Sequence, residues 1–225
     1  PRDFDDWAAL GNPGWGWGDV LPYFRKLEDS EHGPDGLRGV GGPVHVSDVR
    51  ADVHPLCERY LQAGEQLGLA RNPDINGASN EGVAINQITT RNGLRESAST
   101  AYLRPALARR NLRLETGAHV TRVVFGGLRA VGVTYLQNGR EQRCRARCEV
   151  ILAGGSINTP QLLQLSGVGP GAELQALGIP VVADSPAVGQ HLQDHLCIDH
   201  VHRARVPTRN AELGTWHGKL WAGMR

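Results

Sequence analysis

The feature that most constrains the fold of this sequence is a short apolar run that ends at two glycines. Glu149 to Ala153 read EVILA, and Gly154 and Gly155 follow at once. An uninterrupted apolar run of this length is typical of a strand buried on both faces of a parallel sheet. The two glycines lack side chains, so they permit a sharp turn and a close approach of a ligand to the backbone.

A short helix is expected directly after this turn. Thr159 and Pro160 fit an N-cap and a first helical residue, and they predict a helix from Gln161 to Leu165 that stops at Gly167. The N–H groups at the start of such a helix suit a phosphate. Strand–glycine–helix units are common, however, and the three-glycine dinucleotide fingerprint is absent. The pattern alone therefore predicts an α/β unit without naming its ligand.

The first half of the chain is predicted to combine turns with a few helices and one short strand. Residues 1–43 are rich in Gly, Pro and Trp, which favours turns. Four elements are expected before residue 110: a short helix near Val20 to Leu27, a strand from Val44 to Val46, a helix from His54 to Leu67, and a helix from Ser97 to Arg109 that Pro105 kinks or divides.

After residue 111, apolar and polar residues alternate along the chain, and this period of two residues predicts a β-rich segment. Alternating runs cover Leu112 to Thr116, Val120 to Phe125, Val131 to Leu136 and Arg140 to Arg147. The last two runs flank Asn138-Gly139, the strongest short-range signal of a β-hairpin, because both turn residues must accept positive φ. A last helix is expected over Ala172 to Leu177, before Gly178.

Bulk composition narrows the class of partner and the compartment. The 24 basic and 23 acidic residues nearly cancel, so there is no electrostatic reason to expect a nucleic acid or an anionic membrane as partner. No apolar run approaches the length of a transmembrane helix. The cysteines are too sparse for a disulfide framework, which favours reduced thiols and a cytoplasmic location, with peripheral membrane contact left open. They are Cys57, Cys144, Cys148 and Cys197.

Neither end of the sequence resembles a natural terminus. The chain begins at Pro1 rather than Met, and it stops within a stretch, Trp216 to Arg225, that has a helical pattern. We therefore expect an internal fragment of a longer protein.

The segment after the two-glycine turn also has a family resemblance. Gly155 to Gly169 read GSINTPQLLQLSGVG and resemble, at every defined position, the second signature of the glucose–methanol–choline (GMC) oxidoreductases. The resemblance covers essentially the whole chain and is closest to the bacterial choline dehydrogenase-like branch. Further segments follow the family's order: Asp6-Trp7 with GNPGWGWGDVLPYF, GGPVHV (Gly41 to Val46), DINGASNEG (Asp74 to Gly82), GLRESASTAYLRPALARRNL (Gly93 to Leu112), RAVGV (Arg129 to Val133) and VGQHLQDH (Val188 to His195).

This resemblance implies an FAD-dependent enzyme. The implied fold is α/β: an FAD-binding parallel sheet with a β-rich layer, interleaved with part of an α+β substrate domain, and incomplete. By motif, the backbone of Val120 resembles the contact to the adenine part of FAD, and Ala153 and Gly154 resemble residues near its phosphates. The histidine that removes the alcohol proton would lie beyond Arg225, so no catalytic residue is expected in this chain.

The implied activity is oxidation of a primary alcohol, with choline as the leading substrate, to an aldehyde by hydride transfer to the flavin. The electron acceptor is not identified. The fragment alone is expected to be inactive and to bind FAD weakly or not at all, because the family's opening glycine loop would precede Pro1. Residues 1–43 and 81–205 are assigned to the FAD domain, and 44–80 and 206–225 to the substrate domain.

Three positions depart from the family pattern. Gly155 replaces the usual Ala, which is harmless by size; Ala187 replaces Gly, which matters only if that position needs positive φ; and His191 replaces Asn.

Two other readings stay open. His191 and His195 are four residues apart, so a helix would place them on one face as a metal pair of a hydrolase, although no third ligand is fixed by spacing and structural histidines are favoured. The chain could alternatively be a non-catalytic interaction module that keeps the fold without the cofactor.

Overall fold

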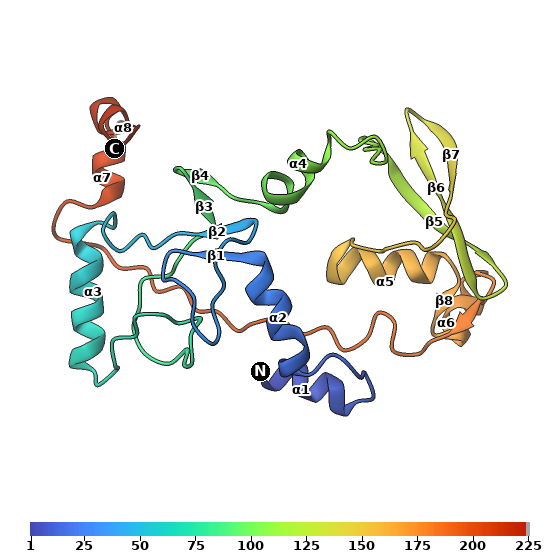
Figure 1. The fold of residues 1–225 in the computed structure, drawn as a ribbon, viewed down its shortest axis with the longest axis horizontal. Coiled ribbons are helices and arrows are strands. Elements are labelled where there is room, and N and C mark those ends of the chain that lie inside the picture. The colour runs from blue at the N-terminus through green and yellow to red at the C-terminus, as the bar shows by residue number, and fades with distance from the viewer. Residues whose placement is uncertain (224–225) are drawn as a thin grey trace. The chain divides into compact units, whose positions relative to one another are not determined.

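The computed structural model describes residues 1–223. The chain forms two compact units, each considered by itself (Figure 1). Unit 1 comprises Pro1–Arg113 together with the chain from Val201 onward, and unit 2 comprises Leu114–His200. This division differs from the domain boundaries expected from the sequence, which stay a prediction because compactness does not reveal which segments serve a cofactor and which a substrate.

Unit 1 opens with two helices, α1 (Arg2–Ala9) and α2 (Trp17–Leu27). The expected short helix near Val20 to Leu27 is confirmed and begins three residues earlier. The first helix was not expected, because a Gly- and Pro-rich composition favours turns. Its Phe4 ring lies 5.7 Å from the ring of Trp17 and 5.6 Å from that of Phe24, so aromatic packing holds the two helices together.

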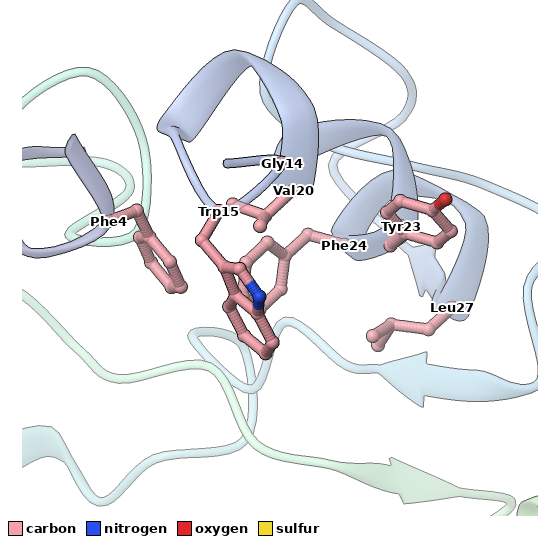
Figure 2. Close-up of a pocket in the computed structure, with 7 residues that line it drawn as sticks. All are labelled: Phe4, Gly14, Trp15, Val20, Tyr23, Phe24 and Leu27. Atoms are coloured by element: carbon pink, nitrogen blue, oxygen red, sulfur yellow. The ribbon is translucent and has the colours of Figure 1, made fainter. Parts of the chain in front are cut away.

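The aromatic side chains of α1 and α2 also border a small apolar cavity of about 330 Å³ (Figure 2). Trp15, in the connecting loop, lines this cavity together with Phe4, Gly14, Val20, Tyr23, Phe24 and Leu27. The Trp15 indole packs edge-on against that of Trp7, with ring centroids 5.8 Å apart.

The remaining strands of unit 1 form two small ladders. β1 (Glu28–Ser30) pairs in parallel with β2 (Val44–Val46), which confirms the strand expected at that position. β3 (Thr90–Arg91) pairs antiparallel with β4 (Leu94–Arg95).

The expected helix at His54 to Leu67 is α3 (Pro55–Gln66). The His54 Nδ1 atom accepts a hydrogen bond from the Leu56 backbone N–H at 3.2 Å and caps its start. The helix ends before Gly68, whose φ of 87° suits a glycine.

The helix expected over Ser97 to Arg109 is present over residues 98–106, and it changes from π- to α-helical one residue before Pro105. A π-helical turn, η1 (Ser99–Leu103), leads into the short α4 (Arg104–Ala106). Two further helices, α7 (Arg209–Leu213) and α8 (Trp216–Gly223), complete the described part of unit 1. The helical pattern expected from Trp216 onward is thus present, and Met224 and Arg225 lie outside the described residues.

Unit 2 contains an antiparallel sheet of three strands in the order β5 (His119–Gly126), β6 (Arg129–Gln137) and β7 (Arg140–Arg145) (Figure 1). The turn between β6 and β7 has φ values of 51° at Asn138 and 73° at Gly139, which confirms the predicted hairpin. The strand expected at Leu112 to Thr116 was wrong: this segment belongs to no ladder, and alternation without a partner does not make a strand.

The remainder of unit 2 contains α5 (Gly155–Leu165), α6 (Gly171–Ala176) and a parallel pair of two-residue strands, β8 (Val168–Gly169) and β9 (Ala183–Asp184). The helix expected near Ala172 is confirmed as α6. The predicted start of α5 was wrong, because Thr159 and Pro160 lie inside the helix and Gly154 is its N-cap. The turn itself initiates the helix, and Pro160 is accommodated at the sixth helical position.

The apolar run Glu149 to Ala153 forms no strand, contrary to the sequence prediction. Its Ile151 side chain is 79% exposed. A parallel strand needs hydrogen-bonding neighbours on its edges, and among the described residues no segment pairs with this run. Mixed helices and small sheets of this kind are consistent with an incomplete α/β fold. Within residues 1–223, no helix is long and apolar enough to cross a bilayer.

Candidate functional site

The three residues expected to contact a cofactor line one cavity of unit 2. Val120 belongs to β5, and Ala153 and Gly154 precede α5. The cavity has a volume of about 1040 Å³, at the upper end of the range of about 300–1,000 Å³ for small-molecule sites. Its other lining residues include Ala118, His119, Thr121, Val133, Val150, Ile151, Leu152, Asn158, Thr159, Gln161, Leu162 and Leu165.

A buried serine fixes α5 against the sheet and thereby sets the shape of this cavity. The Ser166 Oγ atom accepts a hydrogen bond from the Val123 N–H at 2.9 Å and donates to the Leu162 carbonyl at 2.5 Å. Ser166 is 4% exposed and Val123 is 3% exposed. The Arg122 side chain also donates to the Leu165 carbonyl at 3.3 Å. The end of α5 is therefore tied to the strand that carries Val120.

The start of α5 presents backbone donors without a side-chain cap. Gly154 is the N-cap, and no side chain accepts from the first N–H groups of the helix. These groups carry a partial positive charge and suit a phosphate or another anion. Because they lie beside a mainly apolar cavity, one ligand with an aromatic part and a phosphate part fits both features. An adenosine diphosphate moiety has this chemistry.

The two glycines of the turn are needed for different reasons. A Cβ atom on Gly154 would lie 3.3 Å from both the Asn158 Cβ and the Thr159 Oγ1 atoms, so the first position is crowded. A Cβ on Gly155 would meet no atom within 4 Å, but its φ is 81°. The space at Gly155 agrees with the expectation that size does not matter there. The left-handed backbone conformation nevertheless favours glycine.

Several polar residues of the cavity were missed by sequence reasoning, and two of them belong to the first half of α5. Asn158 and Thr159 line it one turn into α5. Thr159 was assigned as a helix cap because it precedes Pro160, and this assignment hid its position on the cavity wall. A helix start placed at the glycine pair would have revealed both side chains.

The His191 and His195 pair does not form the arrangement that a metal site requires. Residues 191–200 contain no helix, so the premise that the two histidines share a helical face was wrong. Within residues 1–223, no group of three His, Cys, Asp or Glu side chains could hold a metal ion. His191 has φ of 57°, a left-handed conformation in which His and Asn are both enriched. Ala187 does not have positive φ, so its replacement of Gly causes no backbone strain.

Most of the perturbed ionisable groups belong to charge networks of unit 1. Hydrogen bonds from the Arg50 side chain hold the pKa of Asp48 well below its usual range. A hydrogen bond to Asp29 raises the pKa of His45. All four cysteines are free thiols, three of them exposed. Among the described residues that line the unit 2 cavity, His119 is the one with an ionisable side chain.

Comparison with protein families gives one match to most of the chain. The family model described as GMC oxidoreductase matches residues 1–197. Among curated proteins, the chain is 45% identical over 222 residues to human "Choline dehydrogenase, mitochondrial", covering 95% of this chain and 37% of that protein. It is 43% identical over 224 residues to the "Oxygen-dependent choline dehydrogenase" of Sinorhizobium medicae, covering 99% of this chain and 40% of that protein. The chain thus spans about two fifths of the length of these relatives.

Solved structures show the same likeness in three dimensions. The structure is similar to that of the pyridoxine 4-oxidase from "Mesorbium loti", with a TM-score of 0.76 and 34% identity over 83% of this chain and 37% of that one. A formate oxidase aligns with a TM-score of 0.73 and 28% identity, covering 84% of this chain and 34% of that one.

Proposed function

Because the chain belongs to the GMC oxidoreductase family, we propose that it is an internal part of an enzyme that oxidises a primary alcohol to an aldehyde. FAD is the cofactor that the family and the FAD-dependent enzymes among the solved structures indicate. Choline is the substrate we favour, because the relatives with more than 40% identity are named choline dehydrogenases.

The observation that carries this proposal is the position of Val120, Ala153 and Gly154 on one cavity. We assign the phosphates of FAD to the Gly154 turn and the uncapped N–H groups of α5. The adenine part is assigned to the apolar side of the cavity, at the backbone of Val120. Thr159 offers a hydroxyl at the same wall for a further hydrogen bond.

Bound FAD would supply the acceptor for the hydride that leaves the alcohol carbon. The role of this chain is to bind and orient the nucleotide half of the cofactor. The base that takes the alcohol proton belongs, in this proposal, to sequence beyond Arg225. The proposal keeps the expected domain assignment, with residues 1–43 and 81–205 serving the cofactor and 44–80 and 206–225 the substrate. It also keeps the expected cytoplasmic location.

The test is to purify the gene product that contains this chain and to measure choline oxidation. Aldehyde formation with reduction of an added dye, or with consumption of oxygen, supports the proposal and identifies the class of electron acceptor. A yellow protein that oxidises other primary alcohols but not choline would overturn the substrate and keep the reaction. A colourless protein without activity would replace the proposal with the alternative of a non-catalytic module.

A further inference from the structure

The cationic residues of unit 2 are confined to one part of its fold. Residues 122–147 contain six arginines and one acidic residue, Glu141, whereas the rest of the unit, 114–121 and 148–200, contains no Arg or Lys and six acidic residues. The arginines are Arg122, Arg129, Arg140, Arg143, Arg145 and Arg147. The near-zero net charge of the whole chain conceals this separation, so a local argument about partners is needed.

Most of these arginines follow the outer strand of the three-stranded sheet. β7 lies at the edge of the order β5-β6-β7, and all of its residues are exposed (Figure 1). Arg143 and Arg145 are two residues apart on this strand, so their side chains leave the same face of the sheet. Arg147 follows directly and is exposed too. The edge therefore presents a row of like charges.

The turn between β5 and β6 adds an apolar tip to this row. Leu128, in the turn, is 79% exposed. The next residue, Arg129, donates from Nη2 to the carbonyl of Arg147 at 3.3 Å, and the Ala146 N–H donates to the Val131 carbonyl at 2.9 Å. These bonds hold the turn beside the end of β7. One exposed leucine thus lies among arginines from both strands.

None of these guanidinium groups is neutralised within the described part of the chain. Within residues 1–223, the ion pairs involve other side chains than Arg129, Arg143, Arg145 and Arg147. Arg129, Arg143, Arg145 and Arg147 are therefore available to an external anion. We call these four arginines, together with Leu128, the basic edge.

We propose that the basic edge is a docking surface for an anionic phospholipid bilayer. Arginines gain from the negative potential of such a surface, and an exposed leucine at a tight turn can enter the boundary between headgroups and acyl chains. Both elements are present in the same place, and the hydrogen bond from Arg129 to Arg147 keeps them together. The attachment would be peripheral and sensitive to salt, because it rests on exposed charges.

Two simpler explanations predict different behaviour. Charged side chains on an edge strand discourage pairing with other strands, and this role needs no lipid. A nucleic acid would also attract a row of arginines through its phosphates, but it offers no apolar layer for Leu128. Of these three explanations, the bilayer alone gives both the arginines and the leucine a favourable environment.

The experiment is sedimentation of the purified gene product that contains this chain with vesicles of phosphatidylcholine and phosphatidylglycerol, compared with vesicles of phosphatidylcholine alone. We expect binding to the anionic vesicles only. The triple variant Arg143→Gln, Arg145→Gln, Arg147→Gln should bind at least about tenfold more weakly. Leu128→Ser should also weaken binding by about tenfold, since it removes the apolar contact without changing charge.

The matched control replaces three exposed arginines outside the sheet, Arg104→Gln, Arg109→Gln and Arg110→Gln, and should retain full binding. Circular dichroism of each variant verifies that it is folded. Equal loss in the control variant, or no binding of the unaltered chain, would overturn the proposal. Two further results would together overturn the proposal and assign the edge to nucleic acid. In the first, Leu128→Ser binds the vesicles as well as the unaltered protein does. In the second, duplex DNA is retarded on a gel by the unaltered protein but not by the triple variant.

Discussion

The Nδ1 atom of His45 lies 2.9 Å from the Oδ2 atom of Asp29, its register partner on the neighbouring parallel strand. The other ring nitrogen lies 3.1 Å from Glu31, and Arg91 approaches Asp29 at 3.4 Å. The hydrogen bond to Asp29 raises the pKa of His45. A hydrogen bond from the Gly41 backbone N–H lowers the pKa of Asp29 most, and the hydrogen bond to His45 lowers it further. A hydrogen bond from the Asp48 backbone N–H lowers the pKa of Glu31 most, and its hydrogen bond to His45 again adds to the effect.

This network predicts an optimum in the pH dependence of unit 1. The raised pKa of His45 contributes stability that is present below its ordinary value of 6.5 and is lost as the pH rises through the folded-state pKa. The lowered pKa values of Asp29 and Glu31 contribute stability above 3.8 and 4.5, which is lost as the pH falls. Stability from this network is therefore greatest between about 4.5 and 6.5.

All five tryptophans belong to unit 1, so tryptophan fluorescence reports its unfolding in urea. The urea midpoint should fall as the pH rises above this window, and His45→Gln should flatten that decline. An identical decline in the variant would show that another group is responsible.

Two helical glycines should respond in opposite directions to alanine. In α3, a Cβ on Gly64 would lie 2.4 Å from the Val83 Cγ1 atom, whereas a Cβ on Gly18 in α2 would meet nothing within 4 Å. We expect Gly64→Ala to destabilise unit 1 by about 1–3 kcal/mol through overpacking. Gly18→Ala should stabilise it by about 0.5–1 kcal/mol because alanine loses less backbone entropy. The urea midpoint of unfolding measures both stability changes. The double variant Gly64→Ala/Val83→Ala should recover part of the stability that Gly64→Ala loses. Equal losses in all variants would refute the packing argument.

The turn at Asn138-Gly139 should be sensitive to a side chain at its second position. Gly139 has φ of 73°, with no atom within 4 Å of a built Cβ, so any cost of Gly139→Ala comes from backbone conformation alone. We expect a loss of about 1–2 kcal/mol. Hydrogen exchange of the β6 and β7 amides measures it, and unchanged protection would show that the turn does not control the hairpin.

Ser166 should contribute more to unit 2 than an exposed serine. Ser166→Ala would leave the buried N–H of Val123 without its acceptor and should cost about 1–3 kcal/mol. Ser156→Ala, at the exposed start of α5, is the matched control and should change stability by less than about 0.5 kcal/mol. Hydrogen exchange of β5 is the measurement. Equal effects of the two substitutions would show that the Ser166 contact does not tie α5 to the sheet.

Local signals in the sequence predicted local structure well. Asn138-Gly139 specified its hairpin because both residues tolerate positive φ. His54 marked the start of α3, and Gly68 marked its end. The run Glu149 to Ala153 failed because a parallel strand depends on neighbours that are distant in sequence. The first helix, α1, was missed because the aromatic packing of Phe4 outweighs the turn-forming composition around it.

The candidate site was predicted in part. The family resemblance predicted Val120, Ala153 and Gly154 as cofactor contacts. Their common cavity could not be predicted from the sequence, because Val120 and Ala153 are 33 positions apart. Asn158 and Thr159 were missed because their exposure to the cavity depends on α5 beginning at Gly155.

The flavin content of the purified gene product tests the central claim most directly. Gly154→Val would push a branched side chain against Asn158 and Thr159 at the cavity wall, whereas Gly36→Val, at an exposed and open position, is its matched control. We expect about one FAD per molecule of the gene product, by visible absorbance, for the unaltered protein and the control, and at least about a tenfold loss for Gly154→Val. Full FAD content in a folded Gly154→Val variant would contradict the assignment of the cofactor to this cavity.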